Sequence, residues 1–151
     1  MTQPIVAALQ MTSLADVTKN VATARRLLRE AKDAGACLAV LPENFSFMGR
    51  NEAERRAVVE EYGKGPAQEA MEATARELKL WIVAGTQPIA VPGDSRPANA
   101  CIVYDDAGRR AARYDKIHLF DVSIPGRDER YLESKSVLVG TGAKPFNPFG
   151  L

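Results

Sequence analysis

The chain has 151 residues, 46% of them hydrophobic, and its 20 Lys and Arg nearly balance its 19 Asp and Glu, which leaves a net charge of +1. Such a balance lacks the basic surface that nucleic acid or an anionic membrane attracts. No apolar run approaches the roughly 20 residues of a membrane span, and one histidine with two distant cysteines lacks a zinc-ligand spacing. We therefore expect a cytoplasmic protein with no metal, nucleic-acid or membrane partner.

The first part of the chain predicts a strand, a helix and a second strand. Residues 5–10 form a short apolar run. Apolar residues then recur at steps of four and three, which is typical of a helix with one buried face. Asp16 is a plausible N-cap and Gly35 a plausible stop for this helix. Residues 37–41 form a second apolar run, so we expect a strand, helix, strand unit with a right-handed crossover.

Two more helices are predicted in the next segment. Asn51 followed by Glu54 resembles a capping box and begins a helix that extends to about residue 61. Pro66 is favoured in the first turn of a helix and begins the other, whose apolar residues reach residue 78.

A third strand and a hairpin follow these helices. Residues 81–86 are predicted as the strand, and residues 91–97, rich in proline, glycine and small polar residues, as a surface connection. Residues 100–104 and 110–116 flank a turn signal that ends in Gly108, which predicts two adjacent antiparallel strands.

Charged residues follow two of these strands directly. Glu43 comes after Leu41-Pro42, and Lys116 closes the second strand of the hairpin. Ligands usually bind at the carboxyl ends of the strands in a sheet layered with helices, so this carboxylate and this ammonium could share one pocket. Taken alone, each residue is more simply explained as a solvated side chain.

The apolar residues of the stretch 117–142 recur with neither the helical nor the strand period, although the stretch is rich in charged and aromatic residues. A loop of this length inside a compact domain is usually functional or disordered. Either outcome would leave it without a predictable helix or strand.

Several segments, in order, resemble the nitrilase superfamily of carbon–nitrogen hydrolases. They are residues 5–11, Asn20, Gly35-Ala36, Leu41-Pro42-Glu43, residues 114–121, Ile124-Pro125-Gly126 and Glu133-Ser134. The last three are most similar to the amidase branch, which holds deaminated-glutathione amidase and omega-amidase.

The resemblance implies an α/β (α+β) fold, the N-terminal part of a four-layer α-β-β-α sandwich. Residues 1–151 would form the N-terminal portion of a single carbon–nitrogen hydrolase domain. The family also implies a homo-oligomer, dimer or larger, that needs no cofactor. Its partner would be a small-molecule amide substrate.

The chemistry implied by the resemblance is hydrolysis of a non-peptide amide through a cysteine thioester. Glu43 matches the family's first glutamate, the general base that activates the thiol. Lys116 matches the lysine that stabilises the oxyanion. Glu133 matches the second glutamate, which holds the site and assists proton transfer, so we expect Glu43, Lys116 and Glu133 to be catalytic.

The nucleophile of this mechanism is expected outside the sequence. Cys37 and Cys101 lie within predicted strands and are more simply explained as inert core thiols. In the family, the nucleophile follows a segment resembling residues 148–151 by a handful of residues. We therefore expect a fragment that is inactive alone and marginally stable, because strand edges and apolar faces would stay uncovered.

Other candidate residues leave alternatives open. Arg127 or Arg130 could bind a substrate carboxylate, or could be surface charge. His118, the only histidine, is expected to orient or pack rather than to catalyse. Arg25, Arg26 and Arg29 resemble a basic patch but are more simply explained as the solvated side of the first helix.

Two other functions are alternatives to the amidase. The chain could be a non-catalytic α/β module that binds a ligand or a completing partner. A dinucleotide-binding domain is disfavoured, because Gln10-Met11-Thr12-Ser13 stands after the first strand where a glycine-rich turn would be needed.

Overall fold

The computed structural model describes residues 3–123 and 130–143. Its helices are α1 (Val17–Asp33), α2 (Glu52–Ala57), α3 (Pro66–Leu78) and the 3₁₀ helix η1 (Glu133–Lys135). Its strands are β1 (Val6–Ala8), β2 (Leu38–Val40), β3 (Trp81–Val83), β4 (Gln87–Ile89), β5 (Ala98–Tyr104), β6 (Arg110–Asp115), β7 (Asp121–Ser123) and β8 (Arg130–Leu132). The predicted α/β class is confirmed.

Strand direction brings three strand ends to the same edge of the main sheet. The strand order is β1-β2-β3-β5-β4, with β6 paired to the free edge of β5. β1, β2 and β3 are parallel, whereas β5 is antiparallel to β3, β4 and β6. Two reversals make β6 run in the same direction as β2, so β2, β3 and β6 all end at the same edge.

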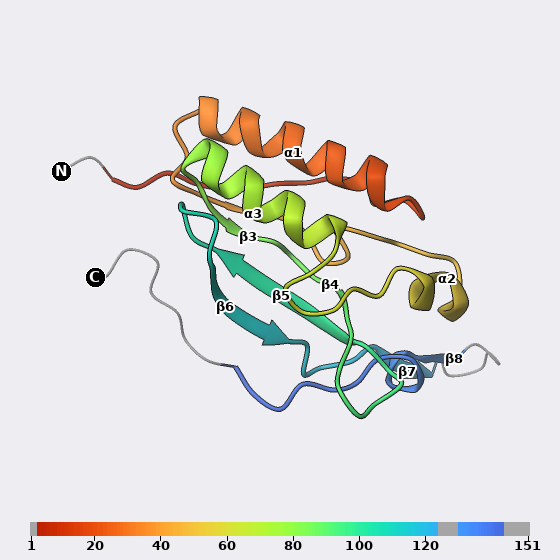
Figure 1. Cartoon of the computed structure of the whole chain (residues 1–151). Coiled ribbons are helices and arrows are strands. Elements are labelled where there is room, and N and C mark those ends of the chain that lie inside the picture. Colours follow the sequence, from red (N-terminus) through yellow and green to blue (C-terminus); the bar gives the residue numbers. More distant parts are fainter. Residues whose placement is uncertain (1–2, 124–129, 144–151) are drawn as a thin grey trace.

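Helices α1 and α3 lie side by side over one face of this sheet (Figure 1). Leu28 of α1 and Met71 of α3 belong to one buried cluster with Ile82, Ile102 and Tyr104 of the strands. Burying each such side chain contributes about 1.5–3 kcal/mol. Helices α1 and α3 form one layer and the main sheet forms a second, and these correspond to two layers of the four-layer arrangement that the resemblance implies.

The predicted helix starts are confirmed by their caps. Asp16 Oδ1 accepts a hydrogen bond from the Lys19 N–H at 3.0 Å, and Asn51 Oδ1 accepts one from the Glu54 N–H at 3.0 Å. Gly35 follows the C-cap of α1 with φ +88°, a conformation that glycine adopts without a steric penalty. Both ends of α1 are therefore encoded locally.

The predicted end of α2 near residue 61 is wrong, since the helix ends at Ala57. The Glu60 N–H donates to the Pro88 carbonyl at 3.2 Å, and the Glu60 carbonyl accepts from the Ala90 N–H at 2.8 Å. The chain therefore leaves the helix to pair with β4, a tertiary contact that capping signals do not encode.

The predicted strand over residues 81–86 is shorter in the structure and is followed by a strand that the sequence did not indicate. β3 ends at Val83, the chain bends at Gly85, and β4 then pairs with the first half of β5. β4 is the last strand in the sheet order and contains Pro88, a residue that sheets tolerate on edge strands.

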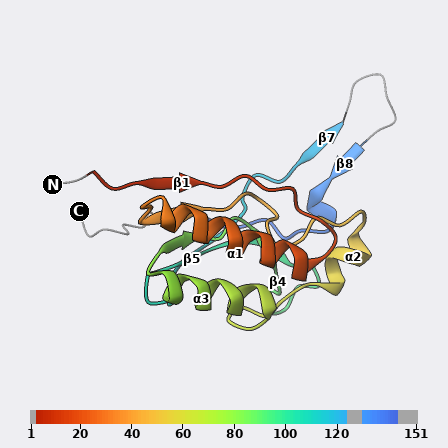
Figure 2. The same ribbon diagram turned by 90° about the horizontal axis from the view of Figure 1, so that it is seen from above.

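The segment predicted to lack regular structure contains a hairpin. β7 and β8 pair with Asp121 opposite Leu132 and project from the main body (Figure 2). Each strand has three exposed residues, which is too short for a period-2 pattern to be detected. The predicted Ile124-Pro125-Gly126 motif lies outside the described residues.

The second face of the sheet carries apolar side chains. Val40, Val83, Cys101 and Tyr114 line an open hollow of about 320 Å³ there, and Val6 at the edge strand is 55% exposed. Among residues 3–123 and 130–143, no helix covers this face (Figure 1). Nor is any helix in those ranges long and apolar enough to cross a bilayer.

Candidate active site

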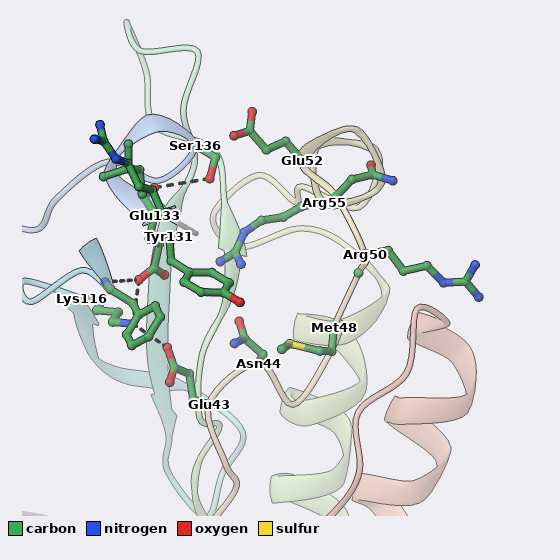
Figure 3. Close-up of a pocket in the computed structure, with 15 residues that line it drawn as sticks. Glu43, Asn44, Met48, Arg50, Glu52, Arg55, Lys116, Tyr131, Glu133 and Ser136 are labelled. Carbon is green, nitrogen blue, oxygen red and sulfur yellow. Dashed lines mark hydrogen bonds and ion pairs between the residues drawn. The ribbon is translucent and has the colours of Figure 1, made fainter. Parts of the chain in front are cut away.

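Glu43, Lys116 and Glu133 lie together at the shared strand edge (Figure 3). Lys116 Nζ donates to Glu43 Oε1 at 2.8 Å and to Glu133 Oε2 at 2.9 Å. Glu43 follows β2 and Lys116 follows β6, so the strand directions alone bring them to the same edge. The geometry places the three predicted residues in one cluster, and their catalytic roles stay predictions.

The segment that carries Glu43 is fixed from three sides. Asn20 on α1 donates to the Ser46 carbonyl at 2.9 Å, and Thr86 Oγ1 accepts from the Asn44 N–H at 2.9 Å. Gly85 packs so closely that an added Cβ would lie 1.9 Å from the Pro42 carbonyl oxygen. These contacts fix the backbone on both sides of Glu43.

Glu133 is held by backbone contacts at the base of the hairpin. Its Oε2 accepts from the Phe120 N–H at 2.7 Å. Beside it, Asp121 Oδ1 accepts from the Ser134 N–H at 3.0 Å, and Arg96 Nη1 donates to the Ser134 carbonyl at 3.2 Å. Hydrogen bonds from Arg96 in turn hold the pKa of Asp94 at about 2. The surface connection of residues 91–97 thereby braces the start of η1.

The charges of this cluster favour an ionised lysine. Burial acts to lower the pKa of Lys116, but hydrogen bonds to Glu43 and Glu133 offset it, and the net pKa is raised. The ammonium is therefore kept charged between its two carboxylates. Glu43 also accepts from Asn99 Nδ2 at 3.2 Å, so its Oε1 has two donors.

A cavity of about 520 Å³ opens onto this cluster. It is lined by four cationic and three acidic side chains together with apolar and polar ones. The lining residues are Glu43, Asn44, Met48, Gly49, Arg50, Asn51, Glu52, Arg55, Lys116, Phe120, Arg130, Tyr131, Leu132, Glu133 and Ser136. The Glu43 side chain is 50% exposed, whereas those of Lys116 and Glu133 are 20% and 16% exposed. A small ligand could therefore reach Glu43 directly.

The other candidate residues are placed as follows. Arg130 lines the cavity, and Arg127 lies outside the described residues. His118 is exposed and does not line the cavity, so the packing alternative is wrong, whereas the orienting role stays a prediction. Arg25 and Arg29 pair with Glu77 of α3 on the surface at 3.3 and 3.4 Å.

Neither cysteine lines the cavity. Cys37 Sγ donates to the Ile5 carbonyl at 3.3 Å. Cys101 lies on the second face of the sheet, where burial raises the pKa of its thiol to about 11. Both are half-buried rather than fully enclosed in the core as predicted. Cys101 lines the hollow on the second face together with Glu43 and Lys116, but its raised pKa disfavours the thiolate that the expected mechanism needs.

Sequence reasoning missed Asn99, Arg96 and Arg55 as parts of this site. Asn99 is a polar residue in the apolar strand β5, which is a detectable signal. Arg96 and Arg55 lie in a loop and on a short helix among other charged residues, where no local pattern separates them from surface charge.

A carboxylate, an ammonium and a second carboxylate in this order suit acid–base chemistry on a polar bond. In general, a carboxylate in such a cluster can accept a proton and an ammonium can stabilise a developing negative charge. Within residues 3–123 and 130–143, no group of three or more His, Cys, Asp and Glu side chains is placed to hold a metal ion.

Comparison with known proteins identifies the class to which this fold and site belong. Residues 5–150 match the model of the carbon–nitrogen hydrolase family, and the chain belongs to that family. The solved structure of the Caenorhabditis elegans NitFhit protein superposes with a TM-score of 0.83 at 32% identity, over 93% of this chain and 34% of that one.

Curated relatives narrow the similarity to amidases. A deaminated glutathione amidase of Synechocystis is 36% identical over 142 residues, which cover 93% of this chain and 51% of the relative. A chloroplastic omega-amidase of Arabidopsis thaliana is 33% identical over 135 residues, which cover 87% of this chain and 36% of the relative. The chain spans about half the length of the curated relatives it matches, or less.

Proposed function

We propose that the complete protein hydrolyses the carbon–nitrogen bond of a small linear amide and releases ammonia. The observation that carries this proposal is the position of Lys116 Nζ, 2.8 Å from Glu43 and 2.9 Å from Glu133. Membership of the carbon–nitrogen hydrolase family and the names of the amidase relatives support it.

In the proposed reaction, Glu43 takes the proton of a cysteine thiol, and the thiolate attacks the amide carbonyl carbon. The carbonyl oxygen becomes an oxyanion, which the Lys116 ammonium stabilises. Glu43 then gives its proton to the nitrogen as the carbon–nitrogen bond breaks, so that ammonia leaves and a thioester forms. Water, deprotonated by Glu43, hydrolyses the thioester to the acid and restores the thiol.

Glu133 acts in this scheme by positioning Lys116. Its Oε2 contacts both Lys116 Nζ and the Phe120 N–H, so the ammonium is fixed before the substrate binds. Preorganised charge of this kind is worth about a hundredfold or more in rate.

The nucleophile in this proposal is a cysteine outside the 151 residues, as the family resemblance implies. Cys101 shares a hollow with Glu43 and Lys116, but burial raises the pKa of its thiol to about 11, which disfavours the reactive thiolate. The 151-residue chain alone would then be inactive. From the family resemblance we further propose that the complete protein is a cytoplasmic homo-oligomer.

The test is ammonia release by the complete protein from primary amides, with mass spectrometry of the trapped enzyme. We expect turnover, a transient acyl adduct on one cysteine, and a loss of about a hundredfold or more in kcat for Lys116→Met. Lys64→Met is the matched control, because Lys64 is exposed and its ion pair within the described residues is with Glu61 at 3.1 Å, away from the cavity. A complete protein that turns over no amide would favour a non-catalytic binding module.

A further inference from the structure

Asn99 is a buried amide in the otherwise apolar strand β5. Its exposed fraction is 0%. Side chains alternate along a strand, and Ala100 belongs to the core beneath the helices, so Asn99 projects from the second face of the sheet. Cys101, two residues further on, lines the hollow there together with Glu43 and Lys116. A buried amide in this place is costly without a hydrogen-bond partner.

The partner of the Asn99 side chain is the carboxylate of Glu43. Asn99 Nδ2 donates to Glu43 Oε1 at 3.2 Å, while Asn99 Oδ1 is buried and accepts no hydrogen bond from residues 3–123 and 130–143. Turning the amide over would set Asn99 Oδ1 against Glu43 Oε1, which are two acceptors with no proton between them. A carboxylate at Glu43 therefore holds the amide in the observed orientation.

Asn99 also holds the backbone that carries Lys116. The Asn99 carbonyl accepts a hydrogen bond from the Lys116 N–H at 3.0 Å, next to the paired residues Ala100 and Asp115 of β5 and β6. On its other side, Asn99 lies opposite Pro88 of β4. One residue of β5 therefore joins the side chain of Glu43 to the main chain of Lys116.

The two donors to Glu43 meet at one oxygen atom. Lys116 Nζ donates to Glu43 Oε1 at 2.8 Å, and Asn99 Nδ2 donates to the same atom, whereas the part of the chain that the structure describes provides no donor to Oε2. The ammonium carries three donors on a flexible stem, and the last torsion of a glutamate is broad and roughly twofold. Lys116 alone would therefore hold either oxygen equally well, and the planar amide of Asn99, fixed in a strand, removes this freedom.

We propose that Asn99 is a positioning residue, which turns the Glu43 carboxylate so that Oε2 and not Oε1 carries the proton. This inference rests on the proposed amidase function and adds the atom through which the proton moves. The proton passes from the thiol to Oε2 as the thiolate forms, and from Oε2 to the nitrogen as the carbon–nitrogen bond breaks. Asn99 neither gains nor loses a proton, and it does not line the cavity.

The experiment uses the complete protein with the variants Asn99→Leu and Asn99→Asp. Leucine removes both polar groups of the amide, and aspartate keeps its shape but removes the donor. Gln87→Leu is the matched control on the adjacent strand β4. Gln87 is also a buried amide, 3% exposed, whose Nε2 and Oε1 have no partner among the described residues, and it does not line the cavity.

We expect Asn99→Leu to lower kcat for a primary amide about tenfold or more, because a hydrogen bond to a charged group is lost, with KM changed less than about twofold. Asn99→Asp should lose at least as much, because a carboxylate beside Glu43 Oε1 repels it. Gln87→Leu should keep kcat within about twofold. Equal losses in Asn99→Leu and Gln87→Leu, a loss confined to KM, or an unchanged kcat in Asn99→Leu would overturn the proposal.

Crystal structures of the complete wild-type protein and of these variants test the positioning without turnover. We expect the Glu43 carboxylate to be rotated, or to occupy two orientations, in Asn99→Leu and to be unchanged in Gln87→Leu. A carboxylate that keeps its wild-type orientation in Asn99→Leu would refute the inference even in an active amidase. If the wild-type protein hydrolyses no amide and the carboxylate of Asn99→Leu does rotate, the proposed function fails and the positioning of Glu43 by Asn99 is supported.

Discussion

Lys116 Nζ lies 2.8 Å from Glu43 Oε1, although the two residues are 73 positions apart in the chain. The contact follows from topology, because β2 and β6 run in the same direction and end at the same edge of one sheet. The site therefore depends on the backbone that holds these two strand ends, and mutations remote from the chemistry should disturb it.

Gly85 is the most sensitive of these supports. A Cβ at Gly85 would lie 1.9 Å from the Pro42 carbonyl oxygen, whereas a Cβ at Gly93 would meet nothing within 4 Å. Both glycines have positive φ, so alanine at either position carries the same kind of backbone strain, and only Gly85→Ala adds overpacking. We predict that Gly85→Ala lowers the free energy of unfolding by about 1–3 kcal/mol more than Gly93→Ala, measured by urea denaturation of the complete protein. Equal losses of stability would show that the backbone at Pro42 and Glu43 shifts to accommodate the added Cβ without a measurable free-energy cost.

Arg96 should act as a positioning residue for Glu133. Arg96→Ala removes the hydrogen bond to the Ser134 carbonyl, so we predict a drop in kcat of about tenfold with KM little changed, and partial recovery in Arg96→Lys. Steady-state kinetics of the complete protein provide the measurement.

The control for Arg96 is Arg76→Ala. Arg76 also donates to a backbone carbonyl, that of Ala107 at 3.2 Å. It lies in the last turn of α3 and does not line the cavity. If both alanine variants lose kcat equally, the effect of Arg96 is general stability and not the position of Glu133.

Cys101 should be unreactive in the folded protein. Burial raises the pKa of its thiol from 9.0 to about 11, so at pH 8 the thiolate is about a hundredfold scarcer than in an exposed cysteine. We predict slow alkylation of Cys101 by iodoacetamide and fast alkylation after denaturation, read by peptide mass spectrometry. The folded state favours the neutral thiol, so this contribution to stability is complete below pH 9.0 and is lost as the pH rises through about 11. Fast alkylation of the native protein at pH 8 would contradict the burial.

The 151-residue polypeptide expressed alone should self-associate and lack amidase activity. Val40, Val83 and Tyr114 lie on the sheet face that no described helix covers, and exposed apolar surface of this kind promotes association. Light scattering would detect the association. A monomer with a cooperative thermal transition well above room temperature would contradict it.

The sequence predicted those parts of the fold that local chemistry encodes. The α1 boundaries follow from Asp16 and Gly35. The position of Glu43 follows from the apolar run of residues 37–41, and that of Lys116 from the predicted hairpin strand of residues 110–116. Glu133 was identified through the family resemblance, since the sequence around it lacks the hydrophobic periodicity of a helix or a strand.

The remaining features arise from contacts between distant segments. α2 ends early because Glu60 pairs with the β4 region, and the hairpin of β7 and β8 has strands too short for a pattern. Arg55 is one arginine beside another in a charged helix, and only the folded chain shows which of them points into the cavity. Side-chain direction on short helices and pairing across a sheet edge are tertiary properties.

The most direct test of the amidase site is kcat of the complete protein with Glu43→Gln, beside Glu61→Gln as a control. The Glu61 side chain is 71% exposed and forms an ion pair with Lys64 on the surface, whereas Glu43 contacts Lys116 in the cavity. We predict that Glu43→Gln lowers ammonia release by about a hundredfold or more with an unchanged melting temperature, and that Glu61→Gln retains full activity. Wild-type ammonia release in Glu43→Gln would show that Glu43 is not the general base and would contradict the proposed mechanism.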